Sequence, residues 1–161
     1  MHALFFCVLV AGAAFVWWTS GSLPDVVASH FVAGGAANGF MPRGSYVASV
    51  LALVVVVPSL LCSLGWLSGR IPPRFVNLPN KPYWLAPERR EATLASLGRF
   101  GLWAGYATLG LLCTLHWFVV AANTQHPPRL EQAPLVGLMA VYFVALFIGI
   151  AAVLGRFFRV P

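Results

Sequence analysis

Three histidines and one aspartate are the side chains of this sequence best suited to chemistry. They are Asp25, His30, His116 and His126. Imidazoles combined with a carboxylate suit zinc, copper or nickel. However, these residues come from separate segments, and no H-x-x-x-H or H-E-x-x-H pair fixes a ligand geometry. A metal site therefore competes with a plainer interpretation, in which His30 hydrogen-bonds its own loop and His126 is solvated.

Other residue sets that support catalysis are not recognisable. No phosphate-cradling glycine loop and no Ser–His–Asp spacing occurs. Glu88 and Glu91 are one helical turn apart beside Arg89 and Arg90, which makes them charge partners rather than an acid/base pair. The cysteines all fall inside apolar segments, without CxxC spacing: Cys7, Cys62 and Cys113. We therefore expect a non-enzymatic protein with no cofactor, and we assign no metal ligand.

The composition explains where these residues must sit. The chain has 161 residues, of which 60% are hydrophobic and 9% charged, whereas soluble domains carry about 25% charged residues. Lipid must cover part of so much apolar surface. The net charge of +6 does not indicate nucleic-acid binding, because the basic residues flank apolar runs as they do in membrane proteins.

The apolar runs predict an all-α bundle of four membrane spans in a single domain. The runs cover residues 3–18, 45–67, 97–122 and 134–158, each near the ~20 residues that a bilayer requires. The first run lacks a basic n-region and a cleavage site, so we interpret it as a retained span. Loops are expected at 20–44 and 68–96.

The basic residues predict which way the spans point. Most lie between or beside the second and third spans or follow the fourth: Arg70, Arg74, Lys81, Arg89, Arg90, Arg99, Arg156 and Arg159. Only Arg43 and Arg129 lie in the other two connections. The positive-inside rule then places both termini and the 68–96 loop in the cytoplasm. The 20–44 loop faces outward.

Small residues predict how the spans pack. The third span contains Gly101-x-x-x-Gly105, a spacing that lets membrane helices approach closely. His116 lies about 20° around the helix from Gly105, so both face the bundle if either does. An ionisable residue inside a span is a functional candidate. The alternative is a neutral imidazole that hydrogen-bonds a neighbouring helix or interfacial water.

The outward loop carries the first of two recognisable motifs. Its residues resemble the bacterial membrane family known as domain of unknown function 1648: Pro24, His30, Phe31, Gly35, Asn38 and Gly39. The loop departs from that pattern at Ala28 and Val32, where members often have Pro and Asn. Asn38-Gly39 is a strong turn dipeptide, and the glycine pair ending at Gly35 is a second permissive point.

The cytoplasmic loop carries the second and more distinctive motif. It is similar to an N-x-P-N-K-x-Y-W-L-x-P-E-R-R stretch of the same family: Asn77, Pro79, Asn80, Tyr83, Trp84, Pro87, Arg89 and Arg90. Pro87 suits the first turn of a helix, which we expect at the membrane surface. Tyr83 and Trp84 would anchor it at headgroups, while Arg89 and Arg90 meet phosphates. The alternative is a cytoplasmic docking patch for a partner.

The resemblance implies a role at the bacterial inner membrane. The domain also begins the longer immunity proteins of the SdpI type, which protect bacteria from their own toxin and relay its presence. We therefore expect a ligand-binding, sensing or immunity-like module that acts through the outward loop. The alternatives are a small accessory subunit of a larger membrane complex and, more weakly, a metal-binding membrane protein. Expected partners are the lipid bilayer and other membrane proteins or further copies of this chain.

Overall fold

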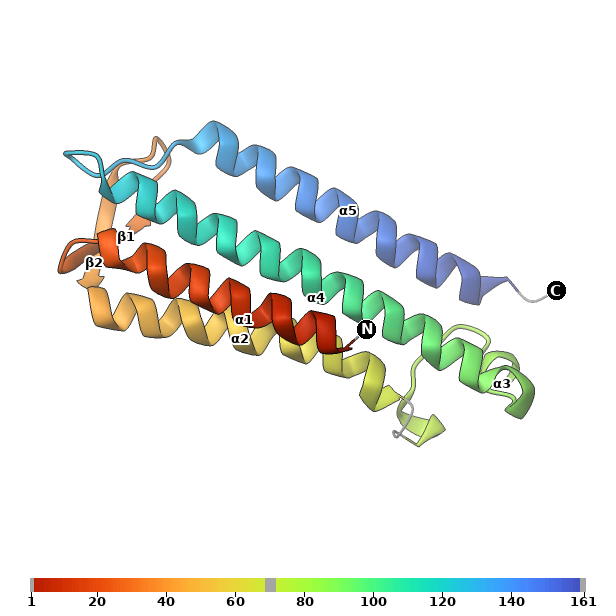
Figure 1. The fold of residues 1–161 in the computed structure, drawn as a ribbon. Helices are drawn as coiled ribbons and strands as arrows, with labels where there is room; N and C mark the ends of the chain where they lie inside the picture. The colour runs from red at the N-terminus through yellow and green to blue at the C-terminus, as the bar shows by residue number, and fades with distance from the viewer. Residues whose placement is uncertain (1, 69–71, 160–161) are drawn as a thin grey trace.

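A computed structural model of the protein describes residues 2–68 and 72–159, and it consists of long helices joined at one end by a β hairpin (Figure 1). The elements in chain order are α1 (His2–Thr19), η1 (Ser20–Ser22), β1 (Val26–Phe31), β2 (Ala37–Pro42), α2 (Arg43–Ser68), η2 (Pro73–Phe75), α3 (Lys81–Trp84), α4 (Pro87–Asn123) and α5 (Gln132–Phe158). Positions 69–71 of the predicted 68–96 loop, Arg70 among them, lie outside the described residues.

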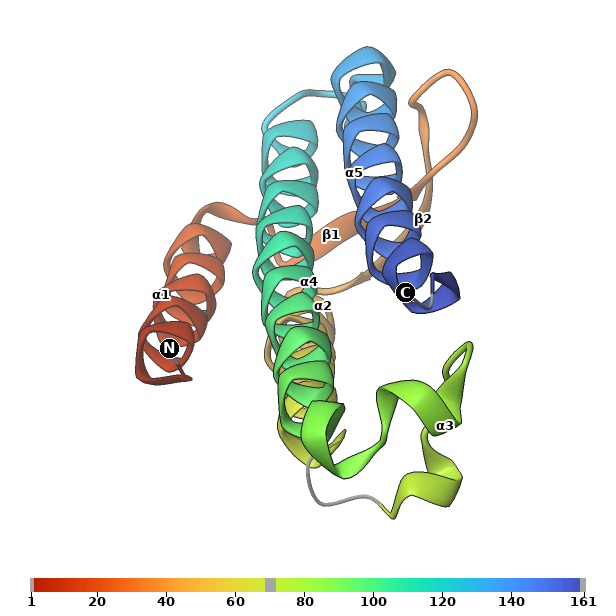
Figure 2. The ribbon, with the colours of Figure 1, turned by 90° about the vertical axis from the view of Figure 1, so that its right-hand side faces the viewer.

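The helices α1, α2, α4 and α5 are each long and apolar enough to cross a membrane. They occupy the four segments in which the sequence predicts spans. α2 and α4 form the most extensive helix pair, α1 packs against both, and α5 packs mainly against α4. α1 and α5 therefore flank the central pair on different sides (Figure 2). Helix length and composition are those of a multi-pass membrane protein.

Small residues bring α1, α2 and α4 close together. A Cβ atom on Gly105 would lie 3.0 Å from the Pro58 carbonyl oxygen and 3.1 Å from the Phe5 ring. The glycine therefore permits the approach of α4 to both neighbours, and Gly101 is buried on the same helix. The buried apolar side chains between these helices are Phe5, Leu9, Val16, Val54, Cys62, Leu102 and Leu109.

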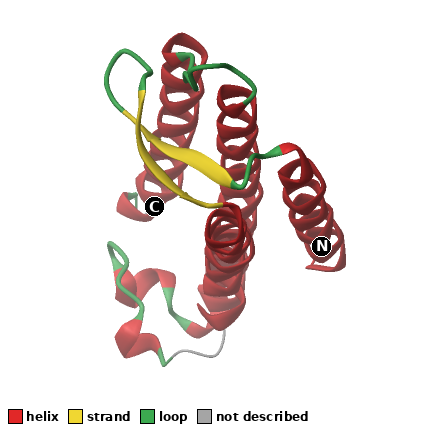
Figure 3. Ribbon diagram, turned by 90° about the vertical axis from the view of Figure 1, so that its left-hand side faces the viewer, coloured by secondary structure: helices red, strands yellow, loops and turns green. Residues whose placement is uncertain are grey.

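The predicted 20–44 loop contains an antiparallel β hairpin, which an all-α fold does not include (Figure 3). Its register pairs Val27 with Met41 and Ala28 with Phe40. Val27 and Ala28 are fully buried, and Val27 packs with Tyr46 of α2. The hairpin forms because its apolar side chains find burial on the helix ends, while the two strands satisfy each other's backbone groups.

The hairpin turns at Gly34-Gly35 and not at Asn38-Gly39. Gly34 and Gly35 have φ angles of +98° and +82°, which glycine adopts without steric cost. Asn38 and Gly39 lie inside β2. Gly39 is needed there for a different reason, because a Cβ atom on it would lie only 2.8 Å from the His30 Cβ.

The surface helix expected after Pro87 is not a separate element. α4 begins at Pro87 and continues for 37 residues to Asn123, so the expected surface helix and the third span are one helix. Between Glu88 and Leu97 the chain has no proline or glycine, and nothing in it interrupts helical hydrogen bonding. The α-helix that precedes α4 in the described residues, α3, has only four residues.

Candidate functional site

His116 joins three helices near the hairpin. It is 2% exposed, with its Nε2 2.8 Å from Thr19 Oγ1 at the end of α1 and its Nδ1 3.0 Å from Tyr46 Oη at the start of α2. Thr19 Oγ1 also donates to the Phe15 carbonyl oxygen at 2.7 Å. A hydroxyl that donates its proton there accepts from His116 Nε2–H, so Nδ1 accepts from Tyr46. A neutral imidazole satisfies all three groups.

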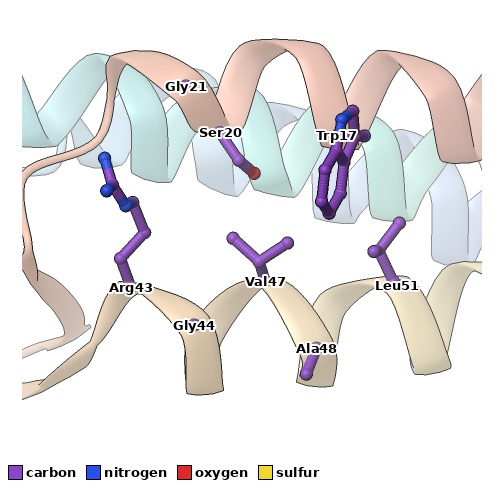
Figure 4. Close-up of a pocket in the computed structure, with 8 residues that line it drawn as sticks. All are labelled: Trp17, Ser20, Gly21, Arg43, Gly44, Val47, Ala48 and Leu51. Atoms are coloured by element: carbon purple, nitrogen blue, oxygen red, sulfur yellow. The ribbon is translucent and has the colours of Figure 1, made fainter.

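A cleft of about 530 Å³ lies between α1 and α2 at the same end. Figure 4 shows Trp17 reaching toward Val47 and Leu51, while Arg43 reaches toward the Ser20–Gly21 segment. The residues that line the cleft are Trp17, Ser20, Gly21, Arg43, Gly44, Val47, Ala48 and Leu51. The cleft residues on α1 and η1 flank Thr19 in sequence, and those on α2 flank Tyr46. His116 hydrogen-bonds to both Thr19 and Tyr46, so it connects the two walls of the cleft.

Arg43 supplies the charge at the mouth of this cleft. Its Nη2 lies 3.2 Å from the Asp25 carboxylate, and its Nη1 donates to the Leu23 carbonyl oxygen at 3.1 Å. The Arg43 backbone N–H also donates to the Asp25 carbonyl oxygen at 2.9 Å. Asp25 is thus an ion-pair partner in the structure.

Asn123 fixes the hairpin to α4. Its Oδ1 accepts from the Ala28 N–H at 2.9 Å, and its Nδ2 donates to the Ala28 carbonyl oxygen at 3.0 Å. Nδ2 also donates to the Val119 carbonyl oxygen at 2.8 Å. The side chain therefore replaces a β-strand partner on the inner side of β1. Sequence reasoning missed this residue, although a buried amide at the end of an apolar run was the available signal.

The signature residues of the predicted outward loop shape the hairpin and do not line the cleft. Gly35 accepts a hydrogen bond from Leu130 N–H at 2.8 Å, and a Cβ atom there would collide with the Leu130 carbonyl oxygen. The turn thereby packs against the segment before α5. Pro24, His30 and Asn38 are exposed.

The second motif holds the end of α5. Asn80, which has a φ of +49°, donates from Nδ2 to the carbonyl oxygens of Phe157 and Phe158 at 3.1 and 3.2 Å. Trp84 Nε1 donates to the Phe157 carbonyl oxygen at 2.9 Å. The last carbonyls of a helix lack intrahelical partners, so Asn80 and Trp84, at the two ends of α3, provide a cap for α5. Thr93 Oγ1 in turn donates to the Trp84 carbonyl oxygen at 3.0 Å and ties this cap to α4.

The aromatic and basic residues of this motif contact one another. The Arg89 guanidinium lies 3.9 Å from the Tyr83 ring centroid, and Arg89 Nε donates to the Tyr83 carbonyl oxygen at 2.8 Å. These contacts fix the 80–89 elbow, and headgroup anchoring by Tyr83 and Trp84 stays a prediction. The other members are placed as follows: Asn77 and Pro87 exposed, and Pro79 and Arg90 half-buried.

The residues considered as metal ligands are not brought together. In the part of the chain that the structure describes, no group of three His, Cys, Asp or Glu side chains could hold a metal ion. Asp25 pairs with Arg43 and His116 bonds to other helices, while His30 and His126 are exposed. The weaker metal-binding alternative therefore has no ligand cluster among these residues.

The hairpin end combines a cleft with apolar walls, one guanidinium at its mouth and a three-helix junction beside it. Chemically, such walls suit a hydrocarbon chain, and the guanidinium suits an anionic oxygen. No family model, no curated protein and no solved structure matches the chain.

Proposed function

We propose that the chain is a non-enzymatic, multi-pass protein of the bacterial inner membrane, with both termini in the cytoplasm and the hairpin outside. The four apolar helices support insertion. The sidedness is supported by the basic residues, which gather around α3 and the end of α5; Lys81, Arg89 and Arg156 are examples. Positive charge of this kind is retained on the cytoplasmic side.

The proposed activity is sensing of an amphiphilic ligand in the cleft between α1 and α2. One observation carries it: the segments that form the cleft walls are also joined through His116. A ligand that separates these walls must lengthen a bond from His116 to Thr19 or Tyr46. α4 carries His116 and runs unbroken to Pro87, so the change has a continuous path to the cytoplasmic elbow.

The resemblance of both motifs to the domain of unknown function 1648 supports a sensing or immunity-like role. A second candidate is an accessory subunit of a membrane complex, for which the outer face of α5 offers an exposed apolar surface. Phe147 is 73% exposed and Ile148 61% exposed, on a face that lipid or a partner helix would cover. Purification in mild detergent with a stoichiometric larger partner would favour the accessory role; a lone monomer or dimer would favour sensing.

The ligand site is tested with an uncharged alkyl maltoside that carries a diazirine in its chain. In nanodiscs of phosphatidylglycerol, light should attach this probe to residues 43–51, because the cleft accepts its alkyl chain. Gly44→Leu should remove most of that labelling. A Cβ atom on Gly44 meets nothing within 4 Å, so the leucine fills the cleft without a backbone clash. Peptide mass mapping measures the attachment.

Gly137→Leu in α5 is the matched control, since a Cβ atom there also meets nothing within 4 Å. Sensing is read from nitroxides at Ser22→Cys and Ser45→Cys in a protein whose Cys7, Cys62 and Cys113 are replaced by alanine. The separation of the two nitroxides should change when the maltoside binds. Labelling of residues 43–51 that Gly44→Leu leaves intact would overturn the ligand site. An unchanged nitroxide separation would overturn the sensing role.

A further inference from the structure

The cleft changes character along its length. Arg43 stands at its mouth, and Val47 and Leu51 follow one and two helical turns deeper on the same face of α2. Eight residues of helix span about 12 Å, so a charged headgroup position lies above a short apolar channel. Trp17 covers this channel from α1 (Figure 4). In the proposed orientation, the cationic end of the cleft lies toward the outer surface and the apolar end lies deeper in the membrane. A lipid of the outer leaflet has its headgroup and acyl chains in the same order.

An ion pair between Arg43 and Asp25 lies at the mouth of the cleft. Arg43 and Asp25 lie 3.2 Å apart, and their side chains are 44% and 92% exposed. A guanidinium has five N–H donors, and Arg43 directs bonds to Asp25 and to the Leu23 carbonyl oxygen. Donor capacity for a phosphate therefore remains. An exposed ion pair is also weak enough to exchange partners.

We propose that the cleft binds a zwitterionic phospholipid with a phosphoethanolamine headgroup, an assignment that rests on the function proposed above. The phosphate binds the Arg43 guanidinium, and the ammonium group pairs with the Asp25 carboxylate that the phosphate displaces. One acyl chain lies between Trp17 and the Val47–Leu51 face. Arg43 and Asp25 are then each paired with the group of opposite charge in the headgroup.

The Asp25 carboxylate is what favours this headgroup over an anionic one. A phosphatidylglycerol phosphate also matches Arg43, but it leaves Asp25 beside a negative charge with no cation to compensate it. A free headgroup such as glycerophosphoethanolamine makes the polar contacts without burying a chain, and exposed polar contacts alone contribute little. Tight binding therefore requires the headgroup and the chain together.

Native mass spectrometry of the detergent-purified protein tests the proposal. With equal amounts of phosphatidylethanolamine and phosphatidylglycerol of identical acyl chains, the protein should retain the ethanolamine lipid about fivefold better, the effect of one exposed ion pair. Asp25→Asn should abolish or reverse this preference. Gly44→Leu should lower retention of the ethanolamine lipid, and Gly137→Leu should not. Glycerophosphoethanolamine should not compete.

The outcomes separate the two proposals. Equal retention of both lipids by the natural protein and by Asp25→Asn would overturn the headgroup assignment, even if the maltoside probe labels residues 43–51. Competition by glycerophosphoethanolamine would overturn the role of the acyl chain. Absence of maltoside labelling in the cleft would instead overturn the proposed function itself.

Discussion

Asn123→Ala is expected to destabilise the protein by about 2–3 kcal/mol, because it leaves a buried backbone donor and a buried acceptor without partners. Both groups belong to Ala28, which is fully buried and which Asn123 contacts through Oδ1 and Nδ2. The hairpin should detach from α4 before the helices separate. Equilibrium unfolding by denaturing detergent in mixed micelles measures the loss, and proteolysis of the hairpin locates it.

Asn38→Ala is the control, because it removes the same side chain from an exposed position of the same hairpin. We expect its effect to stay within about 0.5 kcal/mol. Equal stabilities for the two alanine variants would show that the amide clamp seen at Asn123 does not hold the hairpin.

His116→Ala is expected to cost about 3 kcal/mol, since it leaves a cavity at a buried position and removes two interhelical hydrogen bonds. Tyr46→Phe alone should cost about 1 kcal/mol, the value of one such bond. In the His116→Ala background, Tyr46→Phe should add almost nothing, because its partner is already gone. Unfolding in mixed micelles provides all three values.

His116→Ala also tests whether the loss of stability and the loss of the nitroxide response are separate effects. His126 is exposed, and His126→Ala should leave both stability and the nitroxide response unchanged. With His116→Ala, maltoside should still label residues 43–51, but the separation between the nitroxides at positions 22 and 45 should no longer change when maltoside binds.

The stability measurements have their own contradicting outcome. Additive losses of stability from Tyr46→Phe and His116→Ala would show that Tyr46 and His116 are not joined by a hydrogen bond.

The sequence predicts the helices well because hydrocarbon burial and helix length are properties of single segments. α1 and α5 begin and end within two residues of the predicted spans. The hairpin could not be predicted in the same way. Its pairing shifts between Ala28 and His30, which breaks the alternation of buried and exposed residues that normally identifies a strand.

The candidate site was predictable only in part, because its residues meet from distant segments. The angle between His116 and Gly105 predicts that both lie on one face of the helix, and both are buried. The partners Thr19 and Tyr46 could not be identified, since 97 and 70 residues separate them from His116. The second motif shows the same limit: Tyr83 and Trp84 are typical of a surface anchor, but the sequence does not predict that Asn80 and Trp84 cap a helix that ends more than 70 residues later.

Sidedness is the claim on which the entry of the lipid from the outer leaflet and the cytoplasmic place of the elbow both depend. It is measured with a membrane-impermeant maleimide on intact cells that carry a single cysteine, either Ala36→Cys at the hairpin turn or Glu88→Cys near the start of α4, with Cys7, Cys62 and Cys113 replaced by alanine. Both positions are exposed. We predict that position 36 reacts in intact cells and that position 88 reacts only after the membrane is opened. Reaction of position 88 from outside, with position 36 protected, would contradict the account.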